Sequence, residues 1–406
     1  MQCPRYQHEN PADSALCGEC RARPSVASAG LSSWGPMRRR FVVSMVVTAF
    51  LLCSKLAGAS HLAVTAIPSD TWTKEPGVRV DVGPIGSPDS HRASTPHVIR
   101  FPDGMLRMYY AGNAGILSAV SADGFTWNKE SGFRIPVGIP GQLADAAHPF
   151  LFPIPGGFRM YYGCSDDVFI YNTCSAISAD GLTWMIEAGL RLEHGPPGLL
   201  DSRHTSDPVV IEVPDGLRMY YHAFDGNNSR IMSAVSADGL NWVKEPGVRI
   251  DTGPPGSPDQ LGASHFDIVE GPDGRLLMYY AGGQNEVFGD SILSAISIDG
   301  LTWTKESGIR VNLDPPGSFD DTRVLQPSIL QLSDGEFRMY YTGFHGNLPR
   351  ILSAITQVVA VHPVVAVNPD VGGDGAGSSA GDGGASAGDG GGGGGGRWGW
   401  GRWGLA

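Results

Sequence analysis

The stretch 218–242, RMYYHAFDGNNSRIMSAVSADGLNW, contains the two phrases that decide the fold of this chain. The first phrase, Met-Tyr-Tyr, begins at Met108, Met160, Met219, Met278 and Met339. The second phrase, which ends in Asp-Gly-x-x-Trp, begins at Ser121, Ser178, Ser236 and Ser297. A repeat of about 50 to 60 residues built from short β-rich runs is typical of a propeller or a repeat array.

Each repeat is predicted to form four β-strands. In the third repeat the apolar run 208–213 ends at Asp215-Gly216, and a second Asp-Gly turn at 238–239 precedes the strand that contains Trp242. Asp-Gly between apolar runs is a strong hairpin signal, because tight hairpin turns require positive φ. The repeated tryptophans are expected to pack between neighbouring sheets, with sugar stacking as the alternative: Trp72, Trp127, Trp184, Trp242 and Trp303. The pattern predicts an all-β fold, a five-bladed β-propeller with four-stranded blades.

The two ends of the repeat region complement each other. The fifth repeat ends after 351–355 and lacks the strand Trp-x-Lys-Glu, which stands instead near the start of the domain, at 72–75. We therefore expect an N-terminal strand within 71–80 to complete the last blade and close the ring, which leaves no exposed sheet edge between first and last blades.

The Pro-Asp-Gly hairpin, the Tyr-Tyr strand and the turn Ser-x-Asp-Gly-x-x-Trp resemble the arabinanase, levansucrase and invertase superfamily (glycoside hydrolase families 43, 62, 32 and 68). The resemblance extends over most of the repeat region, 70–357. The turn is also similar to the sialidase Asp-box but is one residue shorter, and the blade count favours the five-bladed group. The resemblance implies a fold, whereas activity depends on the residues of the site.

Five polar residues align at the start of the innermost strands: Thr95, His148, Asp207, His265 and Gln326. Four of them are followed by proline. Polar side chains that face one axis need water or a ligand. The column therefore predicts either a hydrated channel or a site in which Thr95, His148, His265 and Gln326 bind substrate.

Glycoside hydrolysis requires two carboxyl groups, an acid and a base or nucleophile. The resemblance implies that Asp207, which precedes Pro208, contacts sugar hydroxyls as the Asp-Pro of invertase-like enzymes does. The sequence departs from the family at Thr95, where an Asp is expected, and at His265, where a Glu acid is expected. Asp145 and Asp267 are therefore candidate catalytic carboxylates beside Asp207, and strand alternation predicts Asp267 on the His265 face. Other acids remain open as replacements: Asp166, Asp167, Asp225 and Glu286.

A second set of acids recurs in the loops between repeats: Asp89, Asp201, Asp259 and Asp320. A catalytic pair should differ between repeats, whereas these residues occur in four of them. We expect them to hold the loops, for example as Asx-turns.

The net charge of −12 argues against nucleic acid as a partner, because phosphate binding needs a basic surface. A carbohydrate ligand or substrate is the expected partner of the propeller, which is expected to be a monomer and to need no cofactor.

Residues 1–24 resemble a degenerate zinc ribbon. Cys3, Cys17 and Cys20 match its ligand positions, but Tyr6 stands where the second thiolate is expected. Structural zinc sites use four ligands, so either His8 completes the site or the ribbon has decayed. Zinc at this segment is the single cofactor that the sequence suggests.

Residues 37–59 combine a basic start at 38–40, a short apolar core and a small-x-small end. These features indicate a signal peptide, with a membrane anchor as the alternative and Met37 as a possible start codon. Under both alternatives the propeller at 60–357 is exported, to the periplasm, to the outside or to the outer side of a membrane. Contact with a membrane is expected only through residues 37–59.

Two further features complete the chain. Cys164 and Cys174 flank one loop of the second repeat, where a disulfide is possible in an oxidising compartment. Residues 358–406 include a Gly-rich tract and are expected to be a disordered tail.

Two functions are consistent with the sequence. The first is an exported glycoside hydrolase-like propeller that acts on or binds a polysaccharide at the mouth of the channel. The alternative is a non-catalytic propeller that binds a glycan or a protein.

Overall fold

The computed structural model describes residues 67–68, 71–113, 115–137, 144–167, 170–271, 273–284, 289–332, 336–356 and 358–359. Within these ranges the chain forms strands and turns but no helix, which confirms the all-β prediction. The segment with Cys3, Cys17 and Cys20, the segment 37–59 and nearly all of the tail 358–406 lie outside the described residues.

Each sequence repeat forms an antiparallel meander of three long strands, followed in the first four repeats by a short strand. The first comprises β3 (Ser94–Arg100), β4 (Leu106–Gly112), β5 (Gly115–Ser121) and β6 (Asn128–Lys129), with β7 (Ile135–Pro136) also paired to β5. The second comprises β8 (Asp145–Ile154), β9 (Gly157–Asp167), β10 (Ile170–Ser178) and β11 (Met185–Ile186). The third comprises β12 (His204–Val213), β13 (Gly216–Phe224), β14 (Ser229–Ser236) and β15 (Val243–Lys244).

The last two repeats follow the same order. The fourth comprises β16 (Gly262–Glu270), β17 (Leu276–Gly283), β18 (Ser291–Ser297) and β19 (Thr304–Lys305), and the fifth comprises β20 (Arg323–Gln331), β21 (Phe337–His345) and β22 (Leu348–Thr356). Short parallel contacts between β10 and β12 and between β14 and β16 connect the middle three repeats into one continuous sheet.

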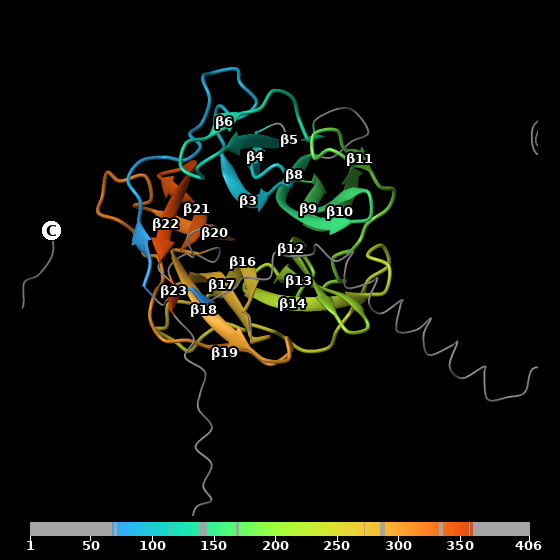
Figure 1. Cartoon of the computed structure of the whole chain (residues 1–406). Helices are drawn as coiled ribbons and strands as arrows, with labels where there is room; N and C mark the ends of the chain where they lie inside the picture. Colours follow the sequence, from blue (N-terminus) through green and yellow to red (C-terminus); the bar gives the residue numbers. More distant parts are fainter. Residues whose placement is uncertain are drawn as a thin grey trace, which may run out of the picture. The chain divides into compact units, whose positions relative to one another are not determined.

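The innermost strands β3, β8, β12, β16 and β20 surround a common axis (Figure 1). Each lies beside the next along the chain, and β20 also lies beside β3. At the N-terminus, β2 (Thr73–Lys74) pairs antiparallel with β22, and Val80 bridges to Ile351. A second N-terminal pair joins β1 (Ile67–Pro68) to β23 (Val358–Val359).

The repeated tryptophans join neighbouring repeats, as the sequence predicts. Each packs edge-on against the first tyrosine of Met-Tyr-Tyr in the preceding repeat, with ring centroids 5.4–5.9 Å apart: Trp72–Tyr279, Trp127–Tyr340, Trp184–Tyr109, Trp242–Tyr161 and Trp303–Tyr220. Four of these tyrosines also donate a hydroxyl hydrogen bond to the carbonyl of an Asp-Gly turn in the next repeat. Trp72 makes the contact that the fifth repeat's own sequence cannot provide.

The recurring loop aspartates are structural, but they do more than form local turns. Asp89 is buried and accepts hydrogen bonds from the hydroxyl of Tyr110 and the ammonium of Lys129. Burial opposes ionisation of Asp89, yet these donors and Ser87 outweigh it and hold its pKa below the usual range. The same Tyr–Asp–Lys arrangement recurs at Asp201, Asp259 and Asp320. These acids therefore tie each linking loop to the sheet.

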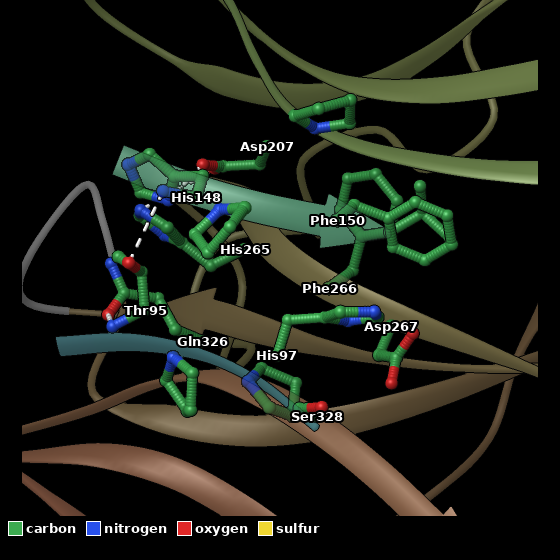
Figure 2. A pocket seen from close by; sticks show the side chains of 15 residues that line it. Thr95, His97, His148, Phe150, Asp207, His265, Phe266, Asp267, Gln326 and Ser328 are labelled. Carbon is green, nitrogen blue, oxygen red and sulfur yellow. Dashed lines mark hydrogen bonds and ion pairs between the residues drawn. The ribbon is translucent and has the colours of Figure 1, made fainter. Parts of the chain in front are cut away.

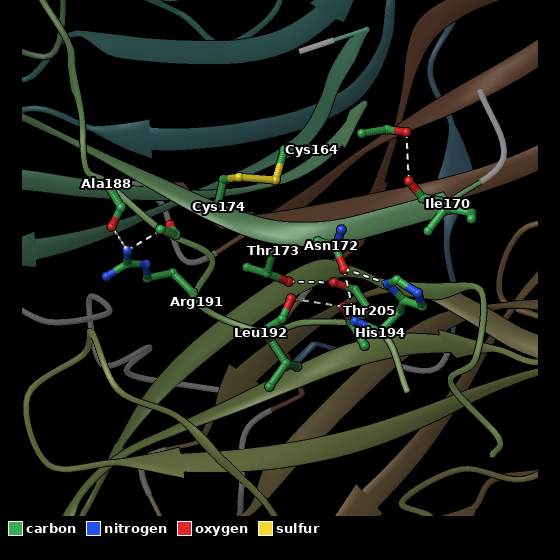
Figure 3. Close-up of a disulfide and its surroundings, with 12 residues drawn as sticks. Cys164, Ile170, Asn172, Thr173, Cys174, Ala188, Arg191, Leu192, His194 and Thr205 are labelled. Atoms are coloured by element: carbon green, nitrogen blue, oxygen red, sulfur yellow. Dashed lines mark hydrogen bonds between the residues drawn. A yellow bond between two sulfur atoms is a disulfide. The ribbon is translucent and has the colours of Figure 1, made fainter. Parts of the chain in front are cut away.

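Cys164 and Cys174 form a disulfide between β9 and β10, with Cα atoms 5.8 Å apart (Figure 3). The bridge is buried and lies close to Tyr171, at the start of β10. It therefore fastens the end of the hairpin that carries a residue of the site described below.

Replacement of both cysteines by serine is expected to destabilise the protein. Loop-closure entropy for a loop of this length corresponds to about 2–3 kcal/mol, or on the order of 5 °C in melting temperature for a domain of this size. Melting curves of oxidised wild-type protein, reduced wild-type protein and the double variant measure the effect. Reduced and double-variant proteins should melt together, and coincidence of all three curves would contradict the prediction.

Candidate functional site

The five column residues share an unusual backbone conformation. Thr95, His148, Asp207, His265 and Gln326 have φ between 43° and 60°, and among the described residues other than glycine no further residue has positive φ. At each of them the pairing of the innermost strand shifts by one residue, which is a β-bulge. Positive φ costs energy outside glycine and is typical of functional sites.

Proline suits the position that follows each bulge. A proline has no N–H group, and within a sheet it is tolerated at a bulge because no ladder hydrogen bond is lost there. Four of the five column residues precede proline. In four of the five repeats the sequence thus combines a bulge, a left-handed residue and a proline, which turn one polar side chain out of the regular strand alternation.

Neighbouring column residues are linked by hydrogen bonds. The backbone N–H of His148 donates to Thr95 Oγ1 at 3.2 Å, and the backbone N–H of Thr95 donates to Gln326 Oε1 at 3.0 Å. Thr95 and Gln326, predicted to bind substrate, are therefore engaged in holding adjacent repeats together.

Asp207 lies at the centre of a histidine cluster (Figure 2). Its Oδ1 contacts His148 Nδ1, while Oδ2 lies 3.2 Å from His222 Nδ1 and 3.6 Å from His265 Nε2. The rings of His148 and His265 lie against each other at a tilt of 35°, with a centroid distance of 5.3 Å. The structure thus brings together three of the predicted site residues, Asp207, His148 and His265, and adds His222.

Asp207 is 6% exposed, so it is not the solvated residue of a hydrated channel. Burial opposes ionisation, but the charges of His148 and His265 and hydrogen bonds from His148 and His222 outweigh it, which holds the pKa of Asp207 well below its usual range. Asp207 is therefore a carboxylate at neutral pH and cannot act as a proton donor.

Two cavities meet at this cluster. A narrow cavity of about 40 Å³, called the narrow channel below, is lined by the column residues and the two residues that follow each of them. A second, wider cavity has a volume of about 530 Å³. His148, His265 and Gln326 line both cavities.

The wider cavity has an aromatic and cationic lining. Its walls include Tyr171, Arg203, His204, His222, Phe224, Arg323 and Phe344. The guanidinium of Arg323 lies 4.4 Å from the centre of the Phe344 ring, and His204 packs against both Tyr171 and Phe224. Aromatic faces beside hydrogen-bond donors are the usual chemistry of a small-ligand site.

Asp145 lies near this cavity but is engaged. Arg92 Nη1 lies 3.0 Å from each of its carboxylate oxygens, and the Tyr171 hydroxyl donates to Oδ2 at 2.5 Å. Burial opposes ionisation, but the Arg92 charge and the Tyr171 hydrogen bond hold the pKa of Asp145 below its usual range. Asp145 is thus a second carboxylate without a proton to donate.

Asp267 is separated from Asp207. Strand alternation predicts it on the His265 face, but the bulge at His265 interrupts the alternation, and Figure 2 shows Asp267 beside His97 and away from the histidine cluster. It accepts hydrogen bonds from the backbone N–H groups of Ile329 at 2.7 Å and Ile268 at 2.9 Å. Burial raises its pKa to about 7 despite these donors. Asp267 therefore joins the fourth and fifth repeats.

Among the described side chains, the remaining candidate acids add no further carboxylate to the site. Asp225 forms an ion pair with Arg230 at 2.8 Å. Glu286 and the side chains of Asp166 and Asp167 lie outside the described part of the structure.

A second column lies three residues before the first, and of its members sequence reasoning identified only Asp145. The members are Arg92, Asp145, His204, Gly262 and Arg323, and four of the five are charged or can become charged. Two of them, His204 and Arg323, line the wider cavity, and Arg92 and Asp145 form the ion pair beside it. Reading the repeats for positions that vary in chemistry would have found this column and His222.

No protein-family model and no curated protein sequence matches the chain. Solved structures do match: a thermostable family-43 glycoside hydrolase (TM-score 0.55, 17% identity, covering 69% of this chain and 91% of that one) is one example. Another is described by the words "the GH130 family of mannoside phosphorylases contains glycoside hydrolases that target β-1,2 mannosidic linkages in Candida mannan" (TM-score 0.56, 16% identity, 72% and 94% covered). An endo-arabinase from Bacteroides thetaiotaomicron is a third (TM-score 0.50, 15% identity, 70% and 98% covered).

At these identities the likeness concerns the fold. The chain has the all-β, propeller-like fold of glycoside hydrolase structures. A search of the described residues for a helix long and apolar enough to cross a membrane found none.

Proposed function

We propose that residues 60–357 form a closed five-bladed propeller in which β2 is the outermost strand of the last blade. Three observations support the closure. β2 pairs with β22, Trp72 occupies the inter-repeat tryptophan position, and β20 lies beside β3. The ring brings one column residue from each repeat to the axis.

The propeller is proposed to be an exported protein that binds a carbohydrate in the wider cavity at the channel mouth. The observation that carries this function is the lining of that cavity, where Phe344 lies under Arg323 and where Phe224 and Tyr171 add further aromatic surface. Aromatic faces pack against sugar rings, and arginine and imidazole groups donate to hydroxyls. The neighbouring structures named above are those of glycan-active enzymes, which supports the same ligand class.

Binding is favoured over hydrolysis because the described residues that line the cavity include no carboxylic acid of raised pKa. A glycosidase needs a carboxylic acid of raised pKa beside a second carboxylate. Asp207 and Asp145 both have lowered pKa values, and Asp267, whose pKa is raised, lies with His97 on the narrow channel. Hydrolysis remains the second candidate, since the fold is that of glycoside hydrolases.

Export is supported by the segment 37–59 and by the disulfide Cys164–Cys174, which is typical of an oxidising compartment. N-terminal sequencing of the protein recovered outside the inner membrane of a bacterial host should give Ser60 or His61. Recovery of the full-length chain in the cytosol would contradict export.

Carbohydrate binding can be tested by affinity electrophoresis in gels that contain arabinan, xylan, levan, inulin or mannan. At least one polymer is expected to retard the protein, and Arg323→Ala and Phe344→Ala are each expected to weaken that retention about tenfold, equivalent to roughly 1.4 kcal/mol. Release of reducing ends, measured on the same polymers, is expected to be absent.

The chain provides matched controls at residues that are not among the lining of either cavity, Arg100 and Phe125. Arg100 bonds to the carbonyl of Gly104 in a Pro-Asp-Gly turn, and Phe125 lies under Arg79 much as Phe344 lies under Arg323. Arg100→Ala and Phe125→Ala should retain wild-type retardation. Failure of all five polymers to retard the protein would overturn carbohydrate binding, and release of reducing ends would favour the hydrolase.

A further inference from the structure

We propose that His148, Asp207 and His265 bind one divalent transition-metal ion, with Zn²⁺ as the metal of choice, at the junction of the two cavities. The three residues come from three successive repeats. One ligand atom from each lies within 4.8 Å of the others, and His265 Nε2 is 3.6 Å from Asp207 Oδ2. Ligand atoms around a tetrahedral zinc ion lie about 3.4 Å apart, given metal–ligand distances near 2.1 Å.

The backbone orients all three groups before any ligand arrives. Each has positive φ at a bulge, 55° for His148, 51° for Asp207 and 43° for His265. Such conformations cost about 1–3 kcal/mol each and persist where the surrounding structure fixes them. Neighbouring sheets fix them here, so the donors converge without further ordering.

Hydrogen bonds beyond the three ligands support them. Nδ1 of His265 lies 2.8 Å from Ser264 Oγ, which leaves Nε2 to face Asp207. His222 is buried between Ser229 Oγ, 2.9 Å from its Nε2, and Asp207 Oδ2, 3.2 Å from its Nδ1. A hydrogen bond on the second ring nitrogen and on the ligating carboxylate is the usual support of a zinc site. His222 is therefore a positioning residue.

The donor set and its surroundings select the class of metal. Two imidazole nitrogens and one carboxylate oxygen suit zinc and related transition metals, whereas Ca²⁺ and Mg²⁺ prefer oxygen ligands. Asp207 is 6% exposed, and its two carboxylate oxygens face His148 Nδ1, His222 Nδ1 and His265 Nε2. No lysine or arginine is among the described residues that line the narrow channel, so no fixed cation competes with a metal there.

Three protein ligands leave one coordination position, which is the arrangement of zinc sites that exchange a ligand. His148 and His265 line both cavities, so this position lies next to both of them. Water or a ligand oxygen would occupy it. Metal binding does not depend on the identity of the cavity ligand, so it can be tested even if carbohydrate binding fails.

The test measures metal content in the full chain. Because Cys3, Cys17 and Cys20 are thiols in a ribbon-like segment, the reference protein carries all three as serine. After treatment with EDTA and dialysis against Zn²⁺, it is expected to retain one equivalent of zinc by mass spectrometry and to melt at a higher temperature than the metal-free protein.

The ligand variants are His148→Asn and His265→Asn, because asparagine tolerates positive φ but replaces the imidazole. Each is expected to weaken zinc binding on the order of 100-fold or more, and His222→Ala by about 10- to 100-fold. His345→Ala is the matched control, since His345 also contacts an aspartate, Asp321 at 3.0 Å, but is exposed. It should bind zinc as the reference protein does.

Absence of stoichiometric zinc in the reference protein, unchanged affinity in both asparagine variants, or preference for Ca²⁺ over Zn²⁺ would overturn the proposal. If a variant fails to fold, the Co²⁺ absorption spectrum of the reference protein tests whether the metal site exists. Strong d–d bands of a four- or five-coordinate ion support the site, and the weak spectrum of an octahedral ion contradicts it.

Discussion

Deletion of residues 60–83 is expected to lower the melting temperature of the protein by well over 10 °C. The segment carries β2, which pairs with β22, and Trp72, which packs on Tyr279. Loss of a packed tryptophan alone costs about 3–5 kcal/mol, and each kcal/mol corresponds to roughly 2–4 °C in a domain of this size. Differential scanning calorimetry of the two proteins measures the shift.

The deletion also removes a buried ion pair. Glu75 accepts hydrogen bonds from Arg338 Nε at 2.7 Å and Nη2 at 2.8 Å and from Ser353 Oγ at 2.6 Å. The side chain of Arg338 is 8% exposed, so removal of its partner leaves a guanidinium with few alternatives. A buried ion pair broken on one side typically costs more than its net contribution when intact.

Point variants distinguish closure of the ring by β2 from the general effect of shortening the chain. If β2 is the last strand of a closed ring, Trp72→Ala should destabilise the protein as much as Trp242→Ala, which breaks the equivalent contact with Tyr161 inside the repeat region. A peripheral segment would give a much smaller effect for Trp72→Ala. An unchanged melt after the deletion, or a silent Trp72→Ala beside a costly Trp242→Ala, would rule out closure by this strand.

Repetition explains why much of the fold could be predicted. A contact that recurs in every repeat leaves the same residues at the same spacing, so the tryptophans and the loop aspartates could be assigned structural roles from sequence. The Trp–Tyr pairs and the Tyr–Asp–Lys arrangement of the loops confirm those roles.

Features that break the strand period could not be predicted in the same way. Alternation assumes regular pleating, and a bulge shifts every following side chain to the other face. Asp267 was therefore expected beside His265, although it bonds to Ile329 N–H instead. His222 and Arg323 were missed because no motif marks them. His222 stands where the other repeats carry Ala, Gly or Thr, and only Arg92 matches Arg323 in its column.

Asp207→Asn is expected to weaken polysaccharide retention at least tenfold and to lower the free energy of unfolding by about 2 kcal/mol. The carboxylate balances the positive charge of the imidazoles around it. A buried charge left without its counter-charge lowers the free energy of unfolding by several kcal/mol. Imidazoles can lose their protons, which reduces that cost. Asparagine tolerates the φ of 51° at this position, so the change tests charge and not backbone strain.

Asp207→Ala separates the backbone from the charge. Alanine at positive φ adds about 1–2 kcal/mol to the cost, so this variant should unfold more easily than Asp207→Asn while losing retention to the same extent. Asp251→Asn is the control. Asp251, like Asp207, contacts a basic side chain, Arg230 at 2.9 Å, but it is 60% exposed, and exposed pairs contribute little. Urea unfolding and affinity electrophoresis of the three variants give both quantities. Full retention of the Asp207→Asn variant would show that the carboxylate is not part of the binding site. A histidine cluster without its central charge should neither keep its geometry nor orient a ligand beside it.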